Sequence, residues 1–97
     1  MLNSRQRAKL RSMANGFDTI LHIGKGGISE EIIKQADDAL VARELIKCRV
    51  LETSPFSSRQ AADLLAEDTK SDVVQVIGSK FILYRENKDN KKIYLVK

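Results

Sequence analysis

The residues that could do chemistry in this chain are concentrated in one short run, Gly24-Lys25-Gly26-Gly27, which holds three glycines in four positions. Glycine has no Cβ and tolerates positive φ, so a ligand can closely approach its peptide amides. A helix that begins just after such a run offers free N–H groups and a partial positive charge, and the lysine adds a flexible cation. This combination favours the capture of phosphates, in the manner of a G-x-x-G clamp on a nucleic-acid backbone.

Two other interpretations of the glycine run compete with this one. Strand-to-helix connections often need glycine for purely structural reasons. A nucleotide-binding enzyme is disfavoured, because the chain has no G-x-x-x-x-G-K-[ST] pattern and because Ser29 stands where G-x-G-x-x-G requires its last glycine. Binding is therefore favoured over catalysis.

The rest of the composition gives no set of catalytic or metal-binding side chains. The chain has one His and one Cys, which cannot form the usual zinc site or an internal disulfide. Cys48 alternates with Ile46 and Val50, so we expect a small buried hydrophobe and not a nucleophile. We predict no catalytic residue, no metal, no cofactor and no small-molecule substrate.

Charge is distributed in blocks along the chain. The 17 Lys and Arg against 13 Asp and Glu give a formal charge of +4, but residues 1–27 carry +4, residues 28–78 carry −4 and residues 79–97 carry +4. Four of the cations, Arg5, Arg7, Lys9 and Arg11, recur at helical spacing and form a broad cationic face. This pattern attracts a polyanion if the fold brings the two basic ends together, whereas the alternative is a solvated surface of mixed charge.

Regular elements must position these groups, and hydrophobic periodicity with capping signals predicts where they lie. The patterns predict helices over residues 4–14, 30–42 and 58–68, strands over 19–23, 45–52, 72–77 and 80–85, and a short extended segment over 93–96. The expected helix caps are Asn3 or Ser4, then Ser29, then Ser57 in a capping box with Gln60. Asn15-Gly16 should end the first helix, because both residues tolerate the left-handed conformation.

The resulting order, α-β-α-β-α-β-β, predicts an α/β fold in which strand–helix–strand passages give parallel strands and the last two strands form an antiparallel hairpin. We expect a two-layer sandwich, with a mixed four-stranded sheet and the helices on one face. The strand order is left open.

Ninety-seven residues fit a single domain spanning 1–97. No apolar run approaches the roughly 18–20 residues that cross a bilayer, so we expect no membrane partner. We also expect a cytoplasmic location and a monomer.

The chain also resembles a known family, the CRM domain (chloroplast RNA splicing and ribosome maturation), and its small bacterial YhbY-like members are closest in size. The resemblance covers nearly the whole chain, and its matching segments are Gln6-Arg7, Leu10-Arg11, His22 to Ile28, Ala39-Leu40, Glu44 to Val50, Val74 to Gly78, Leu83 to Arg85 and Lys92 to Leu95.

The resemblance implies an RNA-binding domain, similar in fold to the C-terminal domain of bacterial initiation factor three. It also implies association with ribosomal RNA in precursors of the large (50S) subunit. The family's RNA contacts map to Gly24, Lys25, Gly26 and Gly27 and to the basic residues of the first helix.

Several other residues are candidates for contact with RNA. Arg85, near the end of its strand, is a further candidate for contact with the RNA backbone. Lys47 and Arg49 point away from the apolar side of their strand, and either solvate the open side of the sheet or extend the RNA surface. Tyr84 and Tyr94 either stack on bases or pack internally.

As a different class of function, the acidic middle of the chain could make it a protein-interaction module that docks on a basic ribosomal protein.

Overall fold

Seven elements follow one another in the computed structural model, which describes residues 2–95. The helices are α1 (Ser4–Ala14), α2 (Glu30–Arg43) and α3 (Ser58–Thr69), and the strands are β1 (Leu21–Ile23), β2 (Leu45–Val50), β3 (Asp72–Ile77) and β4 (Lys80–Tyr84). This sequence of elements confirms the predicted α-β-α-β-α-β-β order.

Each helix begins at a side-chain cap. Asn3 forms a capping box with Gln6, and Ser57 forms a second one with Gln60. Ser29 caps α2 by accepting a hydrogen bond from an amide of the first turn. Because these bonds satisfy amides that have no partner within the helix, they define where each helix starts.

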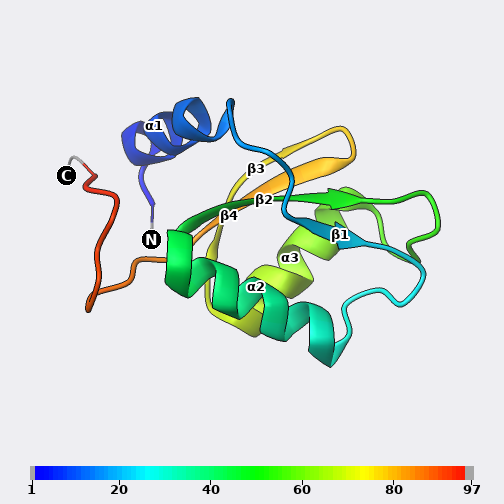
Figure 1. Ribbon diagram of the computed structural model, residues 1–97. Coiled ribbons are helices and arrows are strands. Elements are labelled where there is room, and N and C mark those ends of the chain that lie inside the picture. Colours follow the sequence, from blue (N-terminus) through cyan, green and yellow to red (C-terminus); the bar gives the residue numbers. More distant parts are fainter. Residues whose placement is uncertain (1, 96–97) are drawn as a thin grey trace.

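The four strands form one mixed sheet in the order β1-β2-β4-β3 (Figure 1). β1 and β2 are parallel, as expected for a passage through α2, and β4 runs antiparallel to both β2 and β3. The hairpin therefore places β4 between β2 and β3 and leaves β1 and β3 as the edges. The mixed α/β fold class is confirmed.

The larger core fills the space between the sheet and the helices α2 and α3. Ile46, Cys48 and Val50 of β2 point into it, as their alternation predicted, and they meet Leu40 of α2 and Leu65 of α3. Burial raises the pKa of Cys48 to about 12, so its thiol stays protonated and unreactive at physiological pH.

The prediction that all helices lie on one face of the sheet is wrong, because α1 lies on the opposite face (Figure 1). Leu10 and Ala14 of α1 pack there with Leu45 and Ile82 in a second, smaller core. No crossover rule constrains α1, since it precedes the first strand. The sequence signal for this arrangement was the run of four consecutive apolar residues at 81–84, all of which are buried. A strand with apolar side chains on both sides is covered on both faces.

Two further details differ from the prediction: the backbone at the helix ends and the segment over 93–96. α1 ends where expected, but Asn15 is right-handed, and the left-handed helix ends are instead Glu44 and Lys70. The expected extended segment over 93–96 forms no strand within its described part, residues 93–95, and Val96 lies outside the described residues.

A buried carboxylate anchors the segment that follows β4. Glu44 is fully buried and accepts hydrogen bonds from the backbone amides of Asn87 and Ile93, each at 2.7 Å, and from that of Lys92. Burial raises the pKa of Glu44, but these bonds and the nearby Lys91 charge outweigh it and lower the pKa below its ordinary value. The C-terminal segment is thereby held beside the sheet.

Candidate nucleic-acid interface

The glycine run forms the turn between β1 and α2. The Gly27 amide donates a 3.0 Å hydrogen bond to the Gly24 carbonyl and so closes a tight turn. Lys25 and Gly26 form its exposed tip. Within residues 2–95, the amides of these two tip residues donate to no protein acceptor, so they are available to an external one.

The glycines of this turn have different structural requirements. Gly27 has a φ of +65°, and a Cβ there would lie 3.1 Å from Phe56 and 3.2 Å from Pro55. The fold itself therefore requires glycine at position 27. At Gly26 a Cβ would meet nothing within 4 Å, and its φ is not positive. Internal packing gives no reason for glycine at position 26.

The first turn of α2 modifies the electrostatics beside the loop. Glu30 and Glu31 lie there, where negative charge compensates the helix dipole. These carboxylates weaken the attraction of the helix N-terminus for a phosphate. The loop amides and Lys25 are consequently the stronger anion-binding groups at this end of the molecule.

The four cations of α1 lie in three different environments. Arg5 and Arg11 are exposed, and Lys9 is exposed but reaches the Tyr94 carbonyl at 3.4 Å. Arg7 is half-buried, and its Nε has no hydrogen-bond partner among the described residues. Because Leu10 faces the sheet, α1 presents Arg5 and Arg11 to solvent.

In the structure, α1 and the glycine loop do not form one continuous surface. α1 covers one end of the sheet, and the loop lies at the opposite end, beyond the last residue of β1 (Figure 1). The open part of the sheet face that carries α1 lies between them. The two groups of predicted residues can contact one ligand only if that ligand crosses this face.

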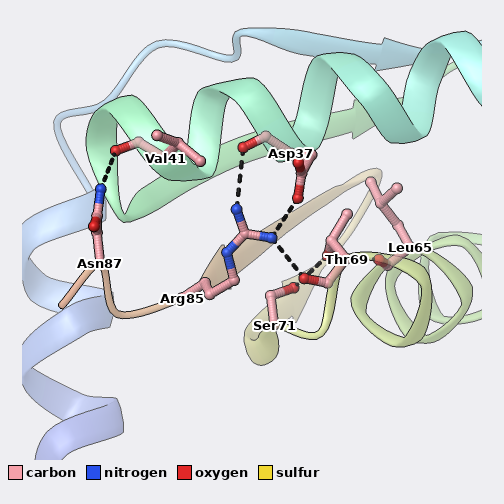
Figure 2. Close-up of polar contacts among 7 residues, drawn as sticks. All are labelled: Asp37, Val41, Leu65, Thr69, Ser71, Arg85 and Asn87. Atoms are coloured by element: carbon pink, nitrogen blue, oxygen red, sulfur yellow. Dashed lines mark hydrogen bonds and ion pairs between the residues drawn. The ribbon is translucent and has the colours of Figure 1, made fainter. Parts of the chain in front are cut away.

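Arg85 is occupied by contacts within the protein (Figure 2). Its guanidinium forms an ion pair with the Asp37 carboxylate and donates hydrogen bonds to the Thr69 carbonyl at 2.7 Å and the Asp37 carbonyl at 3.2 Å. These bonds join the end of β4 to α2 and to the last residue of α3. We therefore place Arg85 in the framework of the fold and leave it out of the interface proposed below.

The two tyrosines considered above lie in different environments. Tyr84 is buried and therefore packs internally. Its burial, together with nearby carboxylates, raises its pKa. Tyr94 is 70% exposed.

Among residues 2–95, no group of three or more His, Cys, Asp or Glu side chains is placed to hold a metal ion. No helix in the described part of the chain combines the length and apolar character of a membrane span.

Comparisons with known proteins agree with this architecture. The family model for the CRS1/YhbY (CRM) domain matches residues 2–85. The chain is 42% identical to "Probable RNA-binding protein YqeI" of Bacillus subtilis, over 98% of this chain and 99% of that one. It is 33% identical to "Probable RNA-binding protein MJ0652" of Methanocaldococcus jannaschii, over 99% of this chain and 72% of that one.

A solved structure supports the same assignment. The solution structure of the hypothetical protein SAV1595 from Staphylococcus aureus superimposes with a TM-score of 0.82 at 50% sequence identity, over 99% of this chain and all of that one. With the mixed sheet, the glycine turn and the family match over most of its length, the chain belongs to the CRS1/YhbY (CRM) domain family.

Proposed function

We propose that this chain is an RNA-binding protein that holds the sugar–phosphate backbone of folded RNA with the glycine loop and α1. The observation that carries the proposal is Gly26, an exposed glycine at a turn tip for which internal packing gives no reason. A bare backbone there lets phosphate oxygens reach the free amides of the tip. The names of the bacterial and archaeal relatives as RNA-binding proteins support the same class of ligand.

In this proposal the loop and the helix have distinct roles. Lys25 neutralises one phosphate, while the amides at positions 25 and 26 orient the oxygens of that phosphate. Arg5 and Arg11 lie along adjacent backbone, with Lys9 and Arg7 contributing positive charge nearby. The remaining loop positions, Gly24 and Gly27, shape the turn.

We propose that the preferred RNA is double-stranded or otherwise folded. Single-strand readers stack bases on exposed aromatic side chains, whereas this surface is rich in cations and has few such rings. Backbone and shape recognition needs cations and amides at fixed positions, which this sheet-and-helix framework can supply.

The resemblance to bacterial CRM proteins supports a more specific form of the proposal. The chain, as one domain over 1–97, would bind ribosomal RNA in precursors of the large subunit, in the cytoplasm, as a monomer and without catalysis. Crosslinking the protein to RNA in cells and sequencing the recovered RNA tests this. We expect large-subunit ribosomal RNA, and recovery of scattered messenger RNA would contradict the assembly role.

A binding measurement tests the site itself. The double variant Arg5→Gln/Arg11→Gln and the variant Lys25→Gln should each weaken binding of a fluorescein-labelled RNA hairpin, by about tenfold and by severalfold respectively. The control is Lys34→Gln/Arg59→Gln, which removes two exposed cations from α2 and α3. Equal losses in the control and the double variant would mean that only net charge matters.

One observation favours a second candidate, a protein-interaction module. α2 and α3 together hold seven acidic and three basic side chains, and such a surface could dock on a basic ribosomal protein. This candidate predicts that Lys25→Asp leaves binding of the partner intact. The RNA proposal predicts a large loss of RNA binding in the same variant.

A further inference from the structure

The face of the sheet that carries α1 is only partly covered. α1 packs over the end of the sheet that holds Leu45, Ile82 and Tyr84. No helix within residues 2–95 covers the other end of the same face, toward the glycine loop and the β3–β4 turn (Figure 1). An uncovered sheet face needs polar side chains or a partner, and its residues indicate which partner it suits.

Strand register brings cations from three parts of the sequence into one row on this open face. His22 of β1 pairs with Arg49 of β2, and Arg49 pairs with Lys80 of β4. Side chains of paired residues point to the same side of a sheet, and neighbouring strands are about 4.8 Å apart. The row therefore spans roughly 10 Å across three strands, with Lys47 two residues before Arg49 on the same side.

This row adjoins the glycine loop directly. His22 and Arg49 are exposed and Lys80 is half-buried, while the neighbouring residues Ile23 and Val50 point into the core on the opposite side. Two residues after His22 the chain enters the turn at Gly24. The loop therefore lies next to the His22 end of the row, beyond the C-terminal end of β1.

A shallow groove connects the same face to α1. It has a volume of about 440 Å³ and is lined by Asn15, which follows α1, by Lys47 and Lys80, and by residues of the β3–β4 hairpin. No carboxylate is among the described residues that line it. By contrast, the two helices on the other side of the sheet carry all seven acidic residues of the three helices.

We propose that this open half of the sheet, the surface formed by His22, Lys47, Arg49 and Lys80, contacts the RNA backbone and joins α1 to the glycine loop in one continuous track. The inference rests on the proposed function and extends it. It solves a geometric problem, because α1 and the loop lie at opposite ends of the sheet and require a connecting surface to hold one RNA. The cations and the carboxylate-free groove match a phosphate backbone and not a basic protein.

The test compares the variant Arg49→Gln/Lys80→Gln with the control Lys34→Gln/Arg59→Gln, which has the same change in charge on the helical face. Lys34 and Arg59 each form an exposed ion pair within their own helix, and such pairs add little stability. Circular dichroism and thermal unfolding first establish that both variants fold. Fluorescence anisotropy with a labelled RNA hairpin then gives Kd at several KCl concentrations.

We expect the sheet variant to bind about tenfold more weakly or worse at moderate salt, with a slope of log K against log salt reduced by roughly 1.5 to 2. The control should keep both the slope and nearly all of the affinity. If the sheet variant and the control behave alike while Lys25→Gln loses affinity, the sheet inference is overturned and the proposed function stands. If the unmodified protein itself fails to bind the hairpin, the proposed function fails, and the sheet inference falls with it.

Discussion

At the scale of single residues, the glycine loop separates a requirement of the fold from a requirement that we assign to RNA binding only by proposal. Gly27 is needed because its backbone is left-handed and because Pro55 and Phe56 occupy the space of a side chain. At Gly26 an added Cβ would meet nothing within 4 Å, and φ is not positive. The two glycines should therefore respond oppositely to the addition of one methyl group.

We predict that Gly26→Ala leaves the thermal stability nearly unchanged and weakens RNA binding by about tenfold, the cost of roughly one lost hydrogen bond to a charged group. Gly27→Ala should lower the free energy of unfolding by about 1 to 2 kcal/mol, because alanine is strained in the left-handed region. Denaturant unfolding and fluorescence anisotropy measure the two effects. An affinity like that of the unmodified protein for Gly26→Ala would contradict the role given to the loop tip.

Glu44 is the second residue whose environment makes a definite prediction. Its folded-state pKa lies below the ordinary value of 4.5, so the stability it contributes is present above that value and is lost as pH falls through the folded pKa. We predict that Glu44→Gln lowers the free energy of unfolding by about 1 to 3 kcal/mol at pH 7. The difference from the unmodified protein should shrink in acid, where the glutamate is itself protonated.

Urea unfolding at pH 7 and at successively lower pH checks this prediction. Glu86→Gln is the control, because Glu86 is an exposed carboxylate whose ion pair is with Lys91 at 3.4 Å. An unchanged gap between Glu44→Gln and the unmodified protein at every pH would show that the carboxylate charge is not what anchors the segment after β4.

At the scale of elements, the most informative contact is the one that Arg85 makes between β4 and the helices α2 and α3. The side chain is 23% exposed and its bonds reach partners on two different helices. A planar guanidinium can serve the Asp37 carboxylate and two carbonyls at once, whereas an ammonium cannot match that geometry. The position of Arg85 at the end of a strand indicates a surface cation, but the packing of the helices makes it a structural bridge.

We predict that Arg85→Lys lowers the free energy of unfolding by about 1 to 3 kcal/mol, through the loss of charged hydrogen bonds. RNA affinity should stay within about twofold of the unmodified protein at temperatures where the variant is folded, because the charge is kept and the site lies outside the proposed track. Thermal unfolding and anisotropy measure both. Unchanged stability with weakened RNA binding would return Arg85 to the interface.

At the scale of the whole molecule, the sheet separates two surfaces of opposite charge. α1 holds four basic side chains and no acidic one, while α2 and α3 on the other side each hold more acidic than basic residues. The net charge of +4 understates this polarity. A polyanion approaching the molecule is attracted to the α1 side and repelled from the side of α2 and α3.

This polarity predicts strong dependence of RNA binding on salt. If about five phosphates are neutralised, log K should fall against log salt with a slope of roughly −3.5 to −4.5. Between 50 and 200 mM salt the affinity should fall on the order of a hundredfold or more. Anisotropy titrations across that range measure the slope, and an affinity that does not change with salt would exclude backbone recognition.

Much of the fold could be predicted because its signals are local. The caps Asn3, Ser29 and Ser57 each bind an amide three residues away, and the alternation around Cys48 is visible within one strand. Such interactions have the same meaning in any tertiary context, which is why element order and boundaries agreed closely. The glycine turn was identified for the same reason.

Long-range packing set the features that local patterns could not reveal. Arg85 and Asp37 are 48 positions apart, and α1 could have covered either face until the second core with Leu45 and Ile82 formed. The row of His22, Arg49 and Lys80 likewise exists only because β4 inserts between β2 and β3. Residue types and their spacing thus predicted the elements and the phosphate-binding chemistry proposed for the loop. The sheet register and the choice of faces placed the cations, because both depend on burying apolar surface that is distant in the chain.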